Sequence, residues 1–132
     1  MFMLRYRLNS KFHVNILMKL VVAVIQPTKL RAVKEALAEV GVERITICDS
    51  QEYAQRPDRV PIFRGLEIST DVLRKSTLEI AVNDDFLERT IETICQVART
   101  GARGSDGDGK IFVLPLAQAI DLKNGSRSKG AI

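Results

Sequence analysis

Apolar residues recur along the chain in two spacings, one typical of buried strands and one typical of amphipathic helices. Residues 20–25 form a continuous apolar, β-branched run that ends at Pro27, which predicts a buried strand. The next apolar residues are spaced three, four and three apart, as on one helix face. They are Leu30, Val33, Leu37 and Val40. We expect Thr28 to cap this helix and Gly41 to end it.

The same alternation of strand and helix patterns continues to residue 115. Residues 45–48 begin a second predicted strand, and residues 78–82 alternate as a third. Asn83 or Asp84 can cap a second helix that Gly101 closes. Its apolar stripe is Leu87, Ile91, Ile94, Cys95 and Ala98. Residues 110–114 form a fourth strand, with Pro115 near its end. The order β-α-β-β-α-β predicts an α+β fold of the ferredoxin-like type.

Three segments fall outside this pattern. Residues 49–64 are polar, contain two prolines and lack apolar periodicity; a connection this long in a compact domain is commonly functional or mobile. The tail, residues 121–132, is polar and contains glycine, so we expect it to be flexible without a partner. Residues 1–17 lack the apolar core of a signal peptide. We interpret them as a disordered extension or an upstream start before a domain of residues 18–132, with a targeting or interaction arm as the alternative.

Composition limits the function classes. The net charge is +4, but three of these charges come from Arg5, Arg7 and Lys11, so the remaining residues are nearly neutral and do not predict a nucleic-acid surface. No apolar run approaches the roughly 20 residues that span a membrane. Cys48 and Cys95 lie in apolar segments, which predicts buried free thiols and fits a reducing cytoplasm.

Residues 100–113 are the most informative stretch. They place four glycines, two aspartates, an arginine and a lysine between a helix pattern and a strand pattern. Glycines allow close backbone approach, and successive amides can form an anion-binding concavity. The segment therefore predicts a phosphate cradle with Lys110 as its cation, although such clusters are often plain turns. No histidine follows residue 13 and no metal-ligand spacing is visible, which argues against hydrolase chemistry and a protein metal site.

These residues carry a family resemblance. Residues 18–42, the FRGLE of 63–67, the RTG and GDGKIFVLP of 99–115, and the final AI together resemble the PII signal-transduction proteins. The resemblance implies a homotrimer of ferredoxin-like subunits that binds ATP or ADP in clefts between subunits. Three loops would grip the nucleotide: the T-loop after the second strand, the glycine-rich B-loop, and the C-loop of the tail. The T-loop would also dock onto a target transporter or enzyme.

Matching the positions of this sequence with the family pattern implies two groups of functional residues, one for the nucleotide and one for an effector. The resemblance implies phosphate binding by Gly107, Asp108, Gly109 and Lys110, with Gly101 opening the loop. It places Thr46 and Glu79 on the adenine and ribose side of the cleft. In the T-loop it implies an effector role for Lys75, which matches a lysine used for 2-oxoglutarate, and for Arg64.

Several positions depart from the family pattern. Ile68 stands where the modified tyrosine would be, and Leu66 where some members carry a phosphorylated serine, so neither covalent switch can operate there. Arg56 replaces the glutamine that chelates Mg²⁺ with 2-oxoglutarate, unless a one-residue shift gives Gln55 that role. Whether this chain senses 2-oxoglutarate therefore stays open.

The phosphate-binding loops also differ. The B-loop carries three extra residues, and Arg103 could replace a missing lysine. The two C-loop arginines fall at Asp121 and Lys123. An aspartate beside a polyphosphate is repulsive by about 1 kcal/mol or more. We therefore predict weaker ATP binding, or a preference for ADP or AMP.

Three functions follow from this reading. The first is a nucleotide-responsive regulator of nitrogen metabolism that acts through its T-loop. The alternative is a PII-like regulator of carbon, bicarbonate or other transport that binds ADP or AMP without uridylylation. A small enzyme or metal-tolerance protein on the same scaffold is disfavoured, because no ligand cluster is present in the sequence.

Overall fold

The computed structural model describes residues 17–53, 62–63, 66–67, 72–127 and 132. Its elements follow the predicted βαββαβ order, with one additional short hairpin and one 3₁₀ turn. They are β1 (Met18–Ile25), η2 (Pro27–Lys29), α1 (Leu30–Glu39), β2 (Thr46–Tyr53), β3 (Ile62–Phe63), β4 (Leu66–Glu67), β5 (Val72–Asn83), α2 (Asp84–Ala98) and β6 (Gly109–Pro115).

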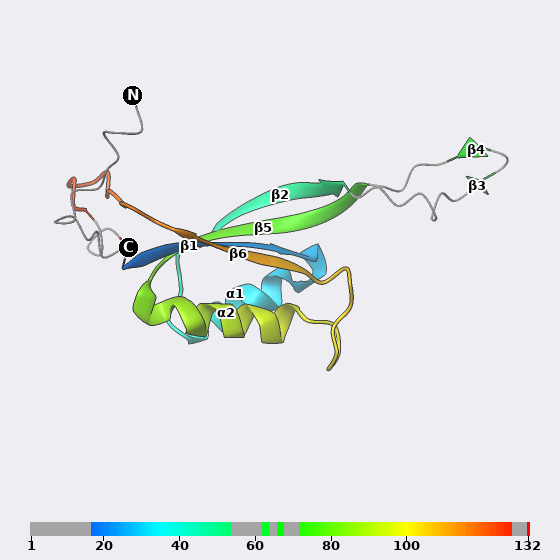
Figure 1. Cartoon of the computed structure of the whole chain (residues 1–132), viewed down its shortest axis with the longest axis horizontal. Coiled ribbons are helices and arrows are strands. Elements are labelled where there is room, and N and C mark those ends of the chain that lie inside the picture. The colour runs from blue at the N-terminus through cyan, green and yellow to red at the C-terminus, as the bar shows by residue number, and fades with distance from the viewer. Residues whose placement is uncertain (1–16, 54–61, 64–65, 68–71, 128–131) are drawn as a thin grey trace, which may run out of the picture.

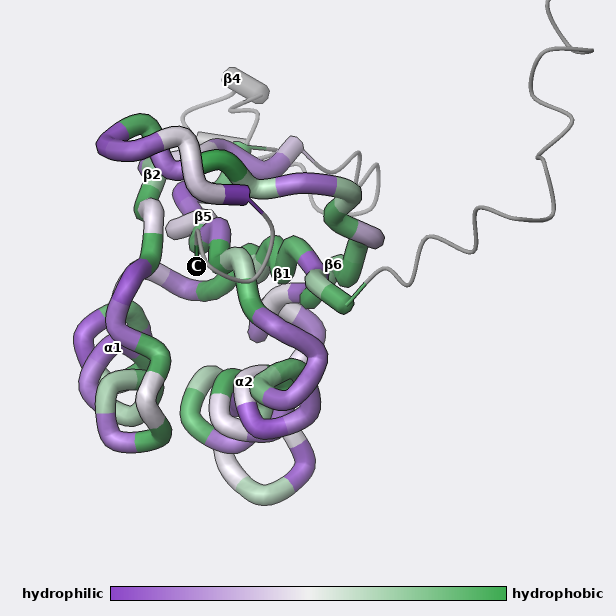
Figure 2. The backbone as a smooth tube through the Cα atoms, turned by 90° about the vertical axis from the view of Figure 1, so that its left-hand side faces the viewer, coloured by the Kyte–Doolittle hydropathy of each residue, from purple (hydrophilic) through white to green (hydrophobic). Residues whose placement is uncertain are grey.

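The main sheet has four antiparallel strands in the order β2-β5-β1-β6, so the first strand lies inside the sheet and the second at its edge. Figure 1 shows α1 and α2 on the same face of this sheet, and the end-on view of Figure 2 shows them side by side. β3 and β4 pair with each other in a separate two-stranded ribbon. The connectivity and the order of the strands confirm the ferredoxin-like prediction.

The core lies between the sheet and the two helices. Alternate residues of β1 and β5 point toward the helices and are fully or almost fully buried: Val21, Ala23, Ile25, Leu78, Ile80 and Val82. Val33 and Leu37 of α1 and Ile94 and Ala98 of α2 complete it, as the sequence periodicity predicts. Neither α1 nor α2, the long helices among the described residues, has the length and apolar content to cross a membrane.

The other face of the sheet is not covered by helices. It carries the residues that alternate with the core positions, such as Val22 of β1, which is paired with Phe112 of β6. Phe112 is 51% exposed and Leu114 is 44% exposed. An apolar sheet face in contact with water is unusual for an isolated subunit and is typical of an assembly surface.

All four strands of the main sheet extend beyond their predicted bounds, β2 and β5 by the most. Residues 49–53, which we expected in the polar connection, continue β2 and pair with β5 up to Val72. Seven of the eight β2 residues are exposed and the eighth is half-buried, because β2 is an edge strand with few contacts on either face. Its side chains therefore show no apolar alternation, which explains the missed boundary.

Two local predictions were wrong. Thr28 lies inside η2 and does not cap α1, whose first turn continues the 3₁₀ turn without a side-chain cap. The Cys48 thiol is exposed rather than buried, since its position on the edge strand faces away from the helices, and Cys95 is half-buried. Asn83 does precede α2, but its side chain makes no capping hydrogen bond.

Candidate functional site

The glycine-rich loop between α2 and β6 is organised around the carboxylate of Asp108. Its Oδ2 atom accepts hydrogen bonds from the backbone amides of Thr100, at 3.0 Å, and Ser105, at 2.8 Å. Its Oδ1 atom accepts one from the Thr100 hydroxyl, at 2.5 Å, and one from the side-chain amide of Gln26, at 3.3 Å. Since one side chain fastens both ends of the loop, the loop is held in place before any ligand binds.

These hydrogen bonds lower the pKa of Asp108 below its ordinary value. The largest cause is the bond from the Thr100 hydroxyl, followed by the Thr100 and Ser105 amides, with a smaller contribution from the charge of Lys29. Desolvation acts in the opposite direction. Asp108 is therefore ionised near neutral pH and remains a strong acceptor for the loop donors.

Two glycines of the loop have backbone conformations that other residues rarely adopt, and a Cβ atom at either would be crowded. Gly109 has φ +119°, and a Cβ atom there would lie 1.8 Å from the carbonyl oxygen of Val24. Gly104 has φ +73°, and its Cβ atom would lie 3.1 Å from Oδ2 of Asp108. Only glycine lets the loop pack this closely against β1 and against its own carboxylate.

A buried lysine connects the loop to the base of the β2–β5 hairpin. Lys75 of β5 is 5% exposed, and its Nζ atom donates to the carbonyl oxygen of Gly107 at 2.7 Å. The side-chain amide of Gln26 donates to the same oxygen at 3.2 Å. The Glu52 carboxylate of β2 lies 3.6 Å from the Lys75 ammonium. With its carbonyl bound by two donors, Gly107 presents less negative potential to an anion approaching the loop.

A cavity of about 310 Å³ lies on the uncovered face of the sheet beside this loop. We call it the loop cavity. Its lining includes a basic residue, two hydroxyl residues and two acidic residues: Lys110, Ser50, Thr77, Glu52 and Asp106. Val24 and Phe112 supply apolar walls. The chemistry is that of a site for a small ligand with both an apolar and a charged part.

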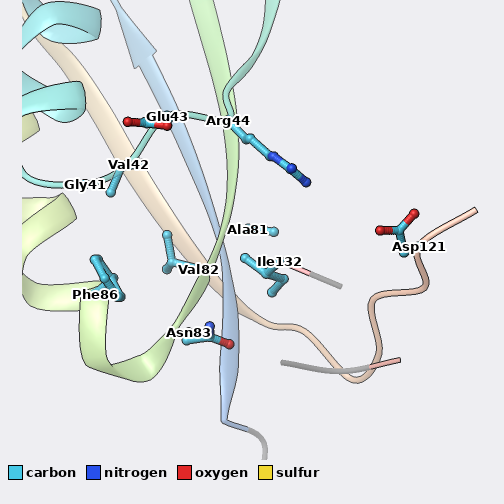
Figure 3. A pocket seen from close by; sticks show the side chains of 10 residues that line it. All are labelled: Gly41, Val42, Glu43, Arg44, Ala81, Val82, Asn83, Phe86, Asp121 and Ile132. Carbon is cyan, nitrogen blue, oxygen red and sulfur yellow. The ribbon is translucent and has the colours of Figure 1, made fainter. Parts of the chain in front are cut away.

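A second cavity, of about 390 Å³, lies at the C-terminal end of β5, and we call it the tail cavity (Figure 3). It lies among the residues after α1, the end of β5, the start of α2, and the C-terminal residues Asp121 and Ile132. In Figure 3, Arg44 and Asp121 point toward each other at one side of it. Asn83 also lines this cavity, and its Oδ1 atom is buried with no hydrogen-bond partner among the residues that the structure describes.

The structure groups some of the predicted site residues and separates others. Gly107, Asp108, Gly109 and Lys110 lie together, and Lys75 contacts them. Thr46 and Glu79 are direct cross-strand partners, but both are exposed on the sheet and line neither cavity.

The remaining predicted site residues lie in the loop and the tail, or outside the described residues. Arg103 and Lys123 are exposed, and the Lys123 amide donates to Oδ1 of Asp121 within a turn of the tail. Gln55, Arg56, Arg64 and Ile68 lie outside the described residues.

The contacts reveal participants that the sequence did not indicate. Gln26, Thr100 and Ser105 hold the loop through Asp108, and Glu52 contacts Lys75. Thr100 and Ser105 belong to the same loop as Asp108, whereas the contacts of Gln26 with Asp108 and of Glu52 with Lys75 join separate elements and depend on the register of the sheet. In the described part of the chain, no group of three or more histidine, cysteine or acidic residues is placed to hold a metal ion.

Comparison with known proteins supplies the remaining observation. Residues 18–126 match the family model of the nitrogen regulatory protein P-II. The chain belongs to the PII family. It is 43% identical over 118 residues to the nitrogen regulatory protein GlnK1 of Methanosarcina mazei, covering 87% of this chain and 97% of that protein. It is 39% identical to the nitrogen regulatory protein P-II of Azospirillum brasilense, covering 87% and 100%.

A solved structure agrees with this assignment. The crystal structure of Arabidopsis thaliana PII bound to citrate matches with a TM-score of 0.69 and 31% identity, over 87% of this chain and 89% of that one. PII proteins are signal-transducing regulators of nitrogen metabolism, not enzymes. Members of the family bind adenine nucleotides and 2-oxoglutarate, and they act as trimers on target proteins.

Proposed function

We propose that this PII-family chain is an adenine-nucleotide sensor, in which the glycine-rich loop and Lys110 hold the phosphates of ATP, ADP or AMP. The observation that carries the proposal is the loop itself. Asp108 fastens it from within, two of its glycines cannot be replaced without collision or strain, and Lys110 lines the cavity beside it. A pre-formed loop with an adjacent cation loses little entropy on binding a phosphate.

The proposed site is completed by a second protomer. The loop cavity contacts β5 near its middle, at Thr77, and the tail cavity contacts the end of the strand at residues 81–83, so the two cavities are separate in one subunit. In a homotrimer, the loop cavity of one protomer would face the Thr46, Glu79 and tail side of the next. The apolar uncovered face around Phe112 supports such an assembly.

The charges around the site favour a nucleotide with few phosphates. Glu52 and Asp106 line the loop cavity, and Asp121 lines the tail cavity. Lys110, Arg44 and the exposed Lys123 provide the positive charge. Because each added phosphate brings negative charge near these carboxylates, ADP or AMP should bind at least as well as ATP.

We further propose that residues 54–71, between β2 and β5, form the T-loop and contact a transporter or enzyme of nitrogen metabolism. With Ile68 and Leu66 at the modification positions, control would depend on ligand binding rather than on a covalent group. A second candidate is regulation of carbon, bicarbonate or other transport. It is favoured by the same lack of a modifiable tyrosine together with Asp121 in place of a basic residue.

A ligand screen by thermal shift tests the proposal. ATP, ADP and AMP are compared on the wild type, on Lys110→Ala and on Lys34→Ala, a matched loss of an exposed lysine on α1. We expect nucleotide to raise the melting temperature of the wild type and of Lys34→Ala. Lys110→Ala should lose about 1.5–3 kcal/mol of binding free energy, the value of a hydrogen bond to a charged group. A wild type without any nucleotide response would overturn the proposal.

A further inference from the structure

The Lys75 ammonium is an exceptional group in this domain. Among the described residues, Lys75 is the one charged side chain in the buried class, at 5% exposure. A buried ammonium is costly unless opposite charge and hydrogen bonds compensate it. Gly107 supplies a carbonyl at 2.7 Å, and Glu52 supplies a carboxylate at 3.6 Å.

The geometry of β2 places this carboxylate. Ser50 is the direct cross-strand partner of Lys75, and Glu52 follows two residues later on the same face of the strand. Glu52 is about half exposed and also lines the loop cavity. Glu52 therefore borders the cavity and also holds its carboxylate 3.6 Å from the Lys75 ammonium, which is not itself among the residues that line the cavity.

We propose that Glu52 is a specificity-determining residue that acts as a built-in counterion. Its carboxylate occupies the position that a free carboxylic acid would need to reach Lys75. The loop cavity then accepts a nucleotide near Lys110 but excludes a second, carboxylate-bearing ligand beside it. This inference rests on the proposed nucleotide site, and it adds that small carboxylic acids are excluded from that site.

Charge and space both support the exclusion. An acid entering the loop cavity toward Lys75 would meet the Glu52 carboxylate directly, with Asp106 also lining the cavity. Like charges at short range repel strongly where solvent is partly excluded. The ammonium offers little in return, because its charge is already compensated and its bond to Gly107 holds the glycine-rich loop.

The test removes only the charge. Glu52→Gln keeps the size of the side chain and leaves Lys75 without its counterion. Binding of 2-oxoglutarate and of citrate is measured by calorimetry and thermal shift, with and without ADP and Mg²⁺. The wild type should show no saturable response to either acid. Glu52→Gln should bind them at least about tenfold more tightly than the wild type does, and the added mutation Lys75→Met should remove this gain.

Glu39→Gln, which removes one exposed carboxylate at the end of α1, is the matched control and should behave like the wild type. Saturable binding of either acid by the wild type would overturn the inference, even if the variant failed to fold. An absent gain in a folded Glu52→Gln would do the same. The failure of the proposed function is separate, because it appears as a missing response to ADP, whereas the acids are also measured without nucleotide.

Discussion

Asp108 binds Thr100 twice, through the backbone amide at 3.0 Å and through the hydroxyl. This pair closes the glycine-rich loop, because Thr100 lies just after α2 and Asp108 just before β6. The third loop contact, from the Ser105 amide, draws the middle of the loop to the same carboxylate. The loop is therefore shaped by its own residues, and its bound form need not be created by the ligand.

Replacing Asp108 by alanine should loosen the loop while leaving the core intact. Three donors from Thr100 and Ser105 would turn to water, and we expect nucleotide affinity to fall by about tenfold or more. Hydrogen exchange should show faster exchange of the loop amides and unchanged protection in β1 and β5. Glu92→Ala, which removes an exposed carboxylate of α2 away from the loop, is the control. Equal nucleotide affinity in Asp108→Ala and the wild type would show that the loop needs no fastening.

Gly109→Ala should destabilise the whole domain. The new Cβ atom would lie 1.8 Å from the carbonyl of Val24, in the central strand, and φ +119° is unfavourable for alanine. We expect a loss on the order of 3 kcal/mol in unfolding free energy, measured by urea denaturation. Gly125→Ala also has positive φ but meets nothing within 4 Å, so it should lose about 1–2 kcal/mol at most. Similar losses in both variants would contradict the predicted collision.

Acid should weaken the contribution of Asp108 to stability. Its pKa is lower in the folded protein than the ordinary value of 3.8, so its stabilising effect is complete above pH 3.8 and is lost as the pH falls through the folded pKa. The difference in melting temperature between the wild type and Asp108→Asn should therefore be constant near neutral pH and shrink below pH 3.8. A difference that grows as the pH falls would mean that the pKa shift has the opposite sign.

Phe112→Glu should separate the subunits without unfolding them. Phe112 is 51% exposed on the uncovered sheet face, next to Val22, so a charge there costs little in one subunit but much in an apolar interface. Analytical ultracentrifugation should show a trimer for the wild type and smaller species for the variant, with unchanged circular dichroism. Gln96→Glu adds the same charge to the exposed surface of α2 and should remain trimeric. A trimer in both variants would place the interface elsewhere.

The sequence predicts the buried part of the fold well, because buried positions carry apolar residues at the spacing of their helix or strand. Val33 and Leu37 have the four-residue spacing of one helix face, and Leu78 and Ile80 have the two-residue spacing of one strand face. Residues 18–42 and 99–115 carry the resemblance to the family. The edge strand β2 has no such regular spacing of apolar residues. Residues 49–53 are mostly polar and, except for the half-buried Ser50, exposed, although they pair fully with β5. Their strand conformation therefore depends on a partner strand that the local sequence does not reveal.

One part of the candidate site could also be predicted from the sequence, and another part could not. The glycines and Lys110 were visible in the sequence because their chemistry is local to one loop. The contacts of Lys75 with Gly107, and of Asp108 with Gln26, join residues 32 and 82 positions apart. Such contacts depend on the register between strands, and no spacing rule of a single sequence predicts them. The contact of Glu52 with Lys75 could not be predicted from the sequence for the same reason.

The central claim is that the glycine-rich loop and Lys110 grip an adenine nucleotide at a junction between protomers. A crystal structure of the protein grown with ADP tests it most directly. The account predicts a trimer with diphosphate density against residues 107–110 of one protomer and the adenosine toward Thr46 and Glu79 of the next. A loop without nucleotide at saturating ADP, or ADP bound wholly within one subunit, would contradict it.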